Sequence, residues 1–245
     1  MNKKRIIKPL FLISVLCLFL TTSCENLLTD TSAETEGSTD PSTTLRIKKV
    51  SYYTPAGLSS YQVYTYSGSQ IRIDSYDSSN TLTVYSIATG TTTSQNQIQY
   101  DVNGTVTGSS VSTFNSSGNT TELVMKDSNG NTILTVNYEY DSHNNILKVT
   151  TTQGDNIAIT DYSNDYDTAA KLTKVTLTNN GEYSARSTYT YSGNVTTINY
   201  EHYSSGTWVA SGKSIITYNS SGYPVQQELR NTSDEMTSRS EYEYE

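Results

Sequence analysis

Aromatic residues that stand directly before turn sequences recur at an almost constant spacing in this chain. A second turn sequence lies near the middle of most intervals, as at residues 127–130 and 203–206. Each interval therefore predicts two strands and two turns, and a fixed period of this kind is the mark of a repeat architecture. The aromatic residues lie 25 to 27 positions apart, at Phe114, Tyr140, Tyr166, Tyr191, Tyr218 and Tyr244.

The turn sequences share a form that explains why the chain should reverse there. An aromatic residue is followed by Asp, Asn or Ser, then by two polar residues, then by Gly or Asn, as in residues 140–145 and 218–222. The side chain of the Asp or Asn can accept a hydrogen bond from the backbone N–H two residues later. The Gly or Asn can take the positive φ that closes the loop.

Between the turns, apolar and polar residues alternate. When every second residue of a strand is apolar, one side of the strand is apolar and the other polar. This alternation predicts half-buried antiparallel strands. In the final segment, Tyr242 and Tyr244 alternate with glutamates, which suits a free edge guarded by charge against pairing with another chain. Elsewhere the predicted apolar sides hold Leu134, Val136, Tyr138 and Tyr140, and then Tyr183, Ala185, Ser187, Tyr189 and Tyr191.

These patterns predict an all-β domain over residues 46–245. We expect a repetitive antiparallel β-hairpin meander of about 14 to 16 strands. The sheet is expected to be open, and twisted or curled, with its phenol rings gathered on one side; twist could curl that side until it closes on itself. Residues 46–108 have the same kinds of residue, but their aromatic residues are less regularly spaced, which suits an atypical terminal cap.

One segment carries a resemblance to a known repeat. Residues 138–146, YEYDSHNNI, resemble the Y-x-Y-D-x-x-G-N-L motif of YD repeats, the unit of RHS-type bacterial proteins. The resemblance implies a sheet of repeated hairpins and implies neither cargo nor self-cleavage, because large RHS proteins wind a much longer chain into a shell. Degenerate copies lie at residues 64–68, 98–104, 166–172, 189–193 and 242–244.

The N-terminal segment has the pattern of an export signal. Four basic residues stand among the first eight, an apolar run follows over residues 10–20, and small polar residues precede Cys24. This predicts a signal peptide over residues 1–23, since the apolar run is shorter than the ~20 residues of a spanning helix. Residues 20–24, LTTSC, resemble a bacterial lipobox, although the leucine lies four positions before the cysteine and not three. The resemblance implies lipidation of Cys24; a plain secreted protein is the alternative.

Residues 24–45 predict a flexible tether behind that cysteine. Ser, Thr, Asp and Glu dominate the segment, which shows no period. It is similar to the acidic tethers of lipoproteins exported to the outer face of the outer membrane, and the resemblance implies a surface-facing protein held to the membrane by its lipid anchor. The periplasmic face is the alternative location. Cleavage would remove four positive residues and take the formal net charge from −8 to about −12.

Composition and charge exclude several function classes. Nucleic acid is not expected as a partner, because phosphate binding needs a basic face and this chain is acidic. Cys17 lies in the leader and Cys24 would be acylated, so we expect no thiol for a disulfide, a nucleophile or a metal. His143 in a predicted turn and His202 at a strand end have no third ligand nearby in the sequence.

Candidate chemistry elsewhere is sparse. Asp161, Asp165 and Asp167 could hold Ca²⁺ through oxygen ligands, but they lack EF-hand spacing and suit ordinary turn carboxylates. No nucleophile elbow and no phosphate-binding glycine loop is present in the sequence. We therefore predict no cofactor, no metal and no catalytic residue, and we do not expect an enzyme.

The chain has 21 tyrosines, 3 phenylalanines and a single tryptophan, Trp208. Tyr ladders can simply pack across strands, or some tyrosines can stay exposed and contact a glycan or protein ligand. Trp208 could cap a core or serve as a contact. We expect a non-enzymatic binding or adhesion module; a structural envelope protein without a ligand is the alternative, and a carbohydrate-active enzyme comes last. The candidate ligand contacts are Trp208, Tyr138, Tyr140, Tyr189 and Tyr191.

Overall fold

The computed structural model describes residues 45–245. These residues form 16 antiparallel strands, which agrees with the number predicted from the spacing in the sequence. No helix within these residues is long and apolar enough to cross a membrane. The strands are β1 (Ile47–Thr54), β2 (Gly57–Ser67), β3 (Gln70–Asp77), β4 (Leu82–Gly90), β5 (Ser94–Asp101), β6 (Val106–Phe114), β7 (Thr120–Asp127), β8 (Thr132–Tyr140), β9 (Ile146–Gln153), β10 (Asn156–Tyr166), β11 (Leu172–Asn179), β12 (Glu182–Ser192), β13 (Val195–Ser204), β14 (Thr207–Tyr218), β15 (Pro224–Arg230) and β16 (Met236–Tyr244).

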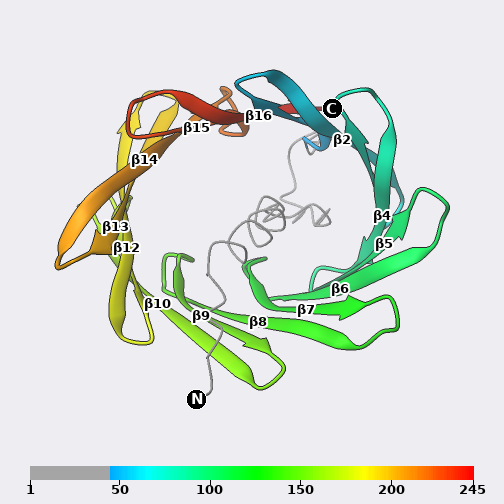
Figure 1. The fold of residues 1–245 in the computed structure, drawn as a ribbon, viewed down its shortest axis with the longest axis horizontal. Helices are drawn as coiled ribbons and strands as arrows, with labels where there is room; N and C mark the ends of the chain where they lie inside the picture. The colour runs from blue at the N-terminus through cyan, green and yellow to red at the C-terminus, as the bar shows by residue number, and fades with distance from the viewer. Residues whose placement is uncertain (1–44) are drawn as a thin grey trace, which may run out of the picture.

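The sheet closes into a ring (Figure 1). Each strand pairs with the next, and β16 pairs with β1, with Tyr242 opposite Val50. Arg46 and Glu245 exchange two backbone hydrogen bonds of 3.1 and 2.9 Å. The expectation of an open sheet is therefore wrong, and so is the free edge guarded by glutamates. Closure satisfies the unpaired backbone groups that an open sheet would leave on both outer strands.

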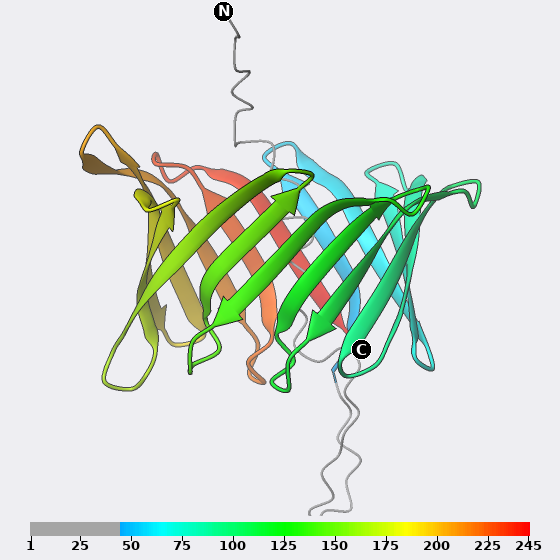
Figure 2. The ribbon, with the colours of Figure 1, turned by 90° about the horizontal axis from the view of Figure 1, so that it is seen from below.

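The connections lie at the two ends of the ring (Figure 2). The chain enters β1 and leaves β16 at one end, which we call the terminal rim. The turns that lead from each odd-numbered strand to the next even-numbered strand lie at the opposite end, which we call the far rim. The strands run obliquely between the two rims, as expected for a closed sheet.

The predicted turn chemistry is confirmed in eight five-residue turns. In one of them, Asp127 Oδ1 accepts hydrogen bonds from the N–H groups of Asn129 at 2.9 Å and Asn131 at 2.8 Å. The N–H of Gly130 donates to the carbonyl of Asp127, and Gly130 has a φ of 84°. The other seven turns begin at Asp77, Asp101, Asn115, Asp141, Asp167, Asn219 and Asn231.

A tyrosine contact at the terminal rim joins the two strands of several hairpins. The hydroxyl of Tyr140, at the end of β8, donates to the carbonyl of Thr120, the first residue of β7, at 2.6 Å. The same contact joins the end of an even-numbered strand to the start of the strand before it in three more places. We call these four contacts the tyrosine latches. The others are Tyr66 to Ile47, Tyr191 to Leu172 and Tyr244 to Pro224, at 2.7 to 2.9 Å.

Alternate residues point to opposite faces of the ring, and burial identifies the inner face. Side chains on the concave side of a closed sheet converge, whereas those on the convex side spread apart. Twelve of the thirteen buried residues share one face by strand register, and Ser51 alone lies on the other. We assign the shared face to the inside. Its two buried clusters comprise Val50, Tyr64, Ile71 and Ala88, and Leu123, Val136, Tyr138 and Val149.

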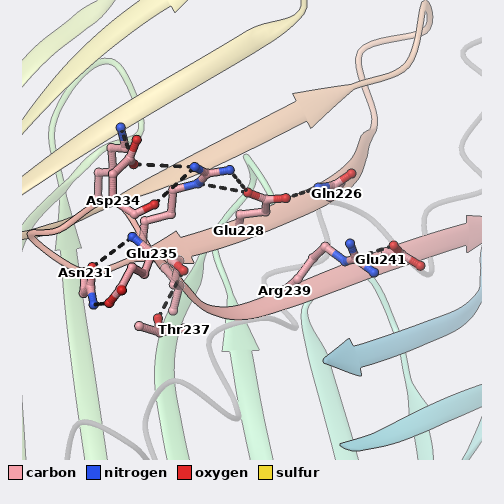
Figure 3. A network of polar contacts seen from close by, with 11 residues as sticks. Gln226, Glu228, Asn231, Asp234, Glu235, Thr237, Arg239 and Glu241 are labelled. Carbon is pink, nitrogen blue, oxygen red and sulfur yellow. Dashed lines mark hydrogen bonds and ion pairs between the residues drawn. The ribbon is translucent and has the colours of Figure 1, made fainter. Parts of the chain in front are cut away.

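The charged side chains of the strands lie on the outer face. The register places the ion pairs between neighbouring strands, such as Glu139 with Lys148, opposite to the buried positions. Figure 3 shows part of this face on β15 and β16 from outside the ring, where Glu228 accepts a hydrogen bond from Gln226 and Arg239 lies beside Glu241. Away from the turns, the inner face is therefore made of aromatic, aliphatic and uncharged polar side chains.

Tyrosines occur on both faces, so the expectation that the phenol rings share one side is wrong in part. The latch tyrosines and the clustered Tyr64 and Tyr138 lie inside. Outer tyrosines stack across strands, as Tyr61 does on Tyr76 and Tyr85 on Tyr100, with ring centroids 4.9 and 4.8 Å apart. Cross-strand pairs therefore use tyrosine on either side of the wall.

The inner tyrosines make the stability of the ring sensitive to alkaline pH. Burial raises the pKa of Tyr140 and of Tyr189 to about 12, above the ordinary value of about 10. The folded protein then holds these protons more tightly than the unfolded chain, so stability falls as the pH rises from about 10 to about 12. We expect the urea midpoint to drop over this window and to drop less in a Tyr140→Phe/Tyr189→Phe variant. Equal slopes in both proteins would contradict the assignment.

Candidate functional site

A β-bulge turns Tyr183 onto the outer face. Leu177 pairs with Ala185, but the next residue, Thr178, pairs with Tyr183, so Ser184 is an extra residue in β12. Tyr183 therefore points to the side opposite Ala185. The alternation expected from the sequence, which grouped Tyr183 with Tyr189, is wrong at this position because a bulge shifts the two-residue period by one.

A second bulge lies on β14 below Trp208. Tyr200 pairs with Gly212 and Glu201 with Ala210, which leaves one extra residue in β14. Trp208 then faces Tyr203 across the β13–β14 hairpin. This hairpin projects from the far rim (Figure 2). The two bulges together place one aromatic side chain from each of β12, β13 and β14 on the same outer surface.

The three aromatic rings meet edge to face. The ring centroids of Tyr203 and Trp208 lie 5.0 Å apart, those of Tyr183 and Tyr203 5.6 Å, and those of Tyr183 and Trp208 5.8 Å. Each pair of planes is inclined by about 60°, which is the edge-to-face arrangement that aromatic quadrupoles favour. We call this group of three residues the aromatic corner.

An ion pair borders the corner. Arg186 of β12 lies opposite Glu201 of β13 and donates to both oxygens of its carboxylate, through Nε and, at 2.9 Å, through Nη2. The Arg186 guanidinium also lies over the Trp208 ring, with Cζ 4.7 Å from the centroid. Hydrogen bonding from Arg186 lowers the pKa of the Glu201 carboxyl, so this group is ionised at neutral pH.

The corner is open to solvent. Tyr183 keeps 58% of its surface exposed and Tyr203 keeps 37%, while Trp208 is half-buried. An exposed aromatic group of this kind is typical of a contact surface.

The five residues predicted as ligand contacts separate onto two faces. Trp208 belongs to the aromatic corner. Tyr138 is 8% exposed within a core cluster, and Tyr189 lies on the same inner face. Tyr140 and Tyr191 form latches, although Tyr191 keeps 42% of its surface exposed. The structure therefore places the four tyrosines on the inner face, two of them with hydrogen bonds within the wall, and does not bring them to Trp208.

Sequence reasoning missed three of the residues that surround Trp208. Tyr203 was recognised only as the start of a turn, and Arg186 and Glu201 were not singled out. Their pairing follows from the register of β12 with β13, which places them directly opposite each other. The sequence did offer one signal of this pair. Arg186 and Glu201 are oppositely charged and lie 15 positions apart, on either side of a predicted turn near residues 192–194.

Three of the other polar residues considered from the sequence have local partners. His143 stacks on Tyr166 at 4.3 Å between centroids. Asp165 pairs with Lys174, and Asp167 holds a turn through its side chain. Within residues 45–245, no three His, Cys, Asp or Glu side chains lie close enough together to hold a metal ion. The predicted signal peptide, Cys24 and nearly all of the predicted tether 24–45 lie outside the described residues.

No protein-family model matches the chain, and no curated protein is significantly similar to it in sequence. Among solved structures, it is similar to a porin-like protein from Bacteroides uniformis (12% identity, covering 81% of this chain and 96% of that one, TM-score 0.33). It is also similar to an exported-protein candidate with a YmcC-like fold from Bacteroides fragilis (14%, 82% and 95%, TM-score 0.28). A lipoprotein candidate from Parabacteroides distasonis matches at 12% (82% and 96%, TM-score 0.27). At these scores the similarities carry no argument about function.

Proposed function

We propose that this chain is a lipid-anchored protein of the bacterial cell envelope and that it acts as a non-enzymatic binding or adhesion module. The observation that carries the proposal is the aromatic corner, where Tyr183 and Tyr203 are exposed on the outer face and contact Trp208. Exposed aromatic side chains with rigid neighbours are the usual anchors of binding surfaces.

The position of the corner supports this role. The chain enters the ring at the terminal rim, next to Arg46, whereas Trp208 lies in a hairpin of the far rim. With Cys24 acylated, the anchor would join the terminal rim, and the corner would stand at the opposite end of the ring. That arrangement presents the corner away from the point of attachment, on the cell surface or on the periplasmic face.

A non-enzymatic role is favoured by the pairing of the two charged groups beside the corner. The carboxylate of Glu201 and the guanidinium of Arg186 are bound to each other in a two-point ion pair. The pKa of Glu201 is lowered by this contact, which makes the residue a poor general acid at neutral pH. The alternative of a purely structural envelope protein is favoured by the tyrosine latches, which use phenol groups to hold the wall together.

Attachment assays distinguish binding from a structural role. Fluorescently labelled mature protein would be applied to intact cells of the producing bacterium and to layers of mucin and collagen. We expect at least one surface to retain the protein and Trp208→Ala to lower retention about tenfold, the effect of losing a binding anchor. Tyr100→Ala, in an outer aromatic pair away from the corner, should leave retention unchanged. Equal retention of the Trp208 variant, or no retention of the wild type, would favour the structural alternative.

The anchor is tested separately in cells. Palmitate labelling of the wild type should be lost in Cys24→Ala, because the thiol is the predicted acylation site. Equal labelling of the two proteins would overturn the lipid anchor while leaving the binding proposal intact.

A further inference from the structure

The open ring surfaces of the aromatic corner belong to its two tyrosines. One face of the Trp208 indole is covered by the Arg186 guanidinium. Tyr183 is the most exposed of the three, and its plane is inclined by 60° to that of Tyr203. Tyr183 and Tyr203 therefore form two walls that are inclined to each other, and Trp208 makes edge-to-face contacts with both.

This shape can accommodate a sugar ring. A pyranose has an apolar face of C–H groups and a rim of hydroxyls. Its apolar face can lie on a phenol ring, which presents a negative π face to the slightly positive hydrogens. The second wall, at about 60°, then contacts the edge of the same sugar.

The guanidinium of Arg186 and the carboxylate of Glu201, beside the two tyrosine rings, can form hydrogen bonds with sugar hydroxyls. A guanidinium has five N–H donors, and the ion pair with Glu201 uses those on Nε and Nη2. A carboxylate oxygen accepts more than one hydrogen bond. Hydroxyl groups both donate and accept, so neighbouring hydroxyls of one sugar can bond to Arg186 and Glu201 without separating them.

The charge around the corner favours an uncharged sugar. Arg186 and Glu201 cancel each other, and Glu182 precedes Tyr183. The whole chain carries a formal net charge of −8. An anionic sugar would meet repulsion both locally and at a distance.

We infer that the aromatic corner binds a neutral pyranose unit of a glycan, stacked on Tyr183 and Tyr203 with its hydroxyls at Arg186 and Glu201. This inference rests on the proposed binding function and specifies its ligand.

The test uses the mature protein on an array of neutral and uronic-acid-containing oligosaccharides, followed by titration with the neutral oligosaccharides that bind. Trp208 is the only tryptophan, so its fluorescence reports on the corner directly. We expect a fluorescence change on binding, and a loss of affinity of about tenfold or more in Tyr183→Ala. Tyr183→Phe should keep most of the affinity because it keeps the ring. Tyr100→Ala is the matched control on the same face, and unfolding midpoints verify that each variant is folded.

The outcomes separate the ligand class from the binding function. If no oligosaccharide binds while Trp208→Ala still abolishes attachment to cells or protein layers, the sugar inference is wrong and the corner has a different ligand. Binding confined to acidic oligosaccharides, or binding that Tyr183→Ala leaves unchanged, would also overturn it. If attachment does not depend on Trp208 either, the proposed function itself fails.

Discussion

Replacing Tyr140 with alanine is expected to destabilise the ring by about 3 kcal/mol or more, which is typical for removing a packed aromatic side chain. Tyr140 packs against the cluster that contains Val136 and Val149, and its hydroxyl donates to the Thr120 carbonyl at 2.6 Å. Alanine removes both the packing and the hydrogen bond, and it leaves the first carbonyl of β7 without its latch. Urea unfolding followed by circular dichroism measures the change.

Two further variants separate the contributions. Tyr140→Phe keeps the ring and loses the latch, so it should cost about 1 kcal/mol. Tyr183→Ala, which removes an exposed tyrosine of the same size, should stay within about 0.5 kcal/mol of the wild type. If Tyr140→Ala costs no more than Tyr183→Ala, the latches do not stabilise the wall.

Replacing Gly212 with alanine is expected to be the second severe change, at about 3 kcal/mol. Gly212 has a φ of +124°, and a Cβ atom there would lie 2.3 Å from the carbonyl oxygen of Arg230. Because that oxygen belongs to the backbone of β15, the strand itself must move to make room. Denaturant unfolding measures the loss of stability.

The same variant should also affect the aromatic corner. Gly212 lies at the bulge that sets the register of the upper part of β14, so the emission of Trp208 is expected to change before the ring unfolds. Gly130→Ala is the control: its φ is +84° but nothing lies within 4 Å of the added atom, so only backbone strain of about 1–2 kcal/mol is expected. Equal costs for the two variants would show that the contact with β15 is easily relieved.

Local features of this fold could be read from the sequence. The Asp or Asn at the start of each five-residue turn and the residue with positive φ three positions later act within five residues, so their chemistry does not depend on distant partners. The spacing of Phe114, Tyr140 and the later aromatic residues marked the ends of the even-numbered strands in the same way. This is why the all-β class and the number of strands were predictable.

Closure of the ring was not predictable from the same patterns. The pairing of β1 with β16 joins residues about two hundred positions apart, and neither strand carries a local sign of its partner. The alternating glutamates of β16 are compatible with a free edge and also with a paired strand of the ring. In the ring they lie on the outer face, where they meet solvent. The accumulated twist and tilt of all sixteen strands decides whether the edges meet.

The aromatic corner was missed for a related reason. The bulge at Ser184 adds one residue and moves Tyr183 to the other face, while the polar and small residues around it look the same in the sequence either way. Strict alternation therefore grouped Tyr183 with the wrong side of the wall. Of the three residues of the corner, the sequence had singled out only Trp208 as a candidate contact.

By itself, the sequence determined the turns, the strand period and the all-β class, because turn hydrogen bonds and the two-residue alternation of a strand are local features. The closed ring, the separation of charged and uncharged faces between outside and inside, and the meeting of Tyr183, Tyr203 and Trp208 were decided by the tertiary structure. They depend on register and on the curvature of the whole sheet, and a single added residue in one strand is enough to change which side chains meet.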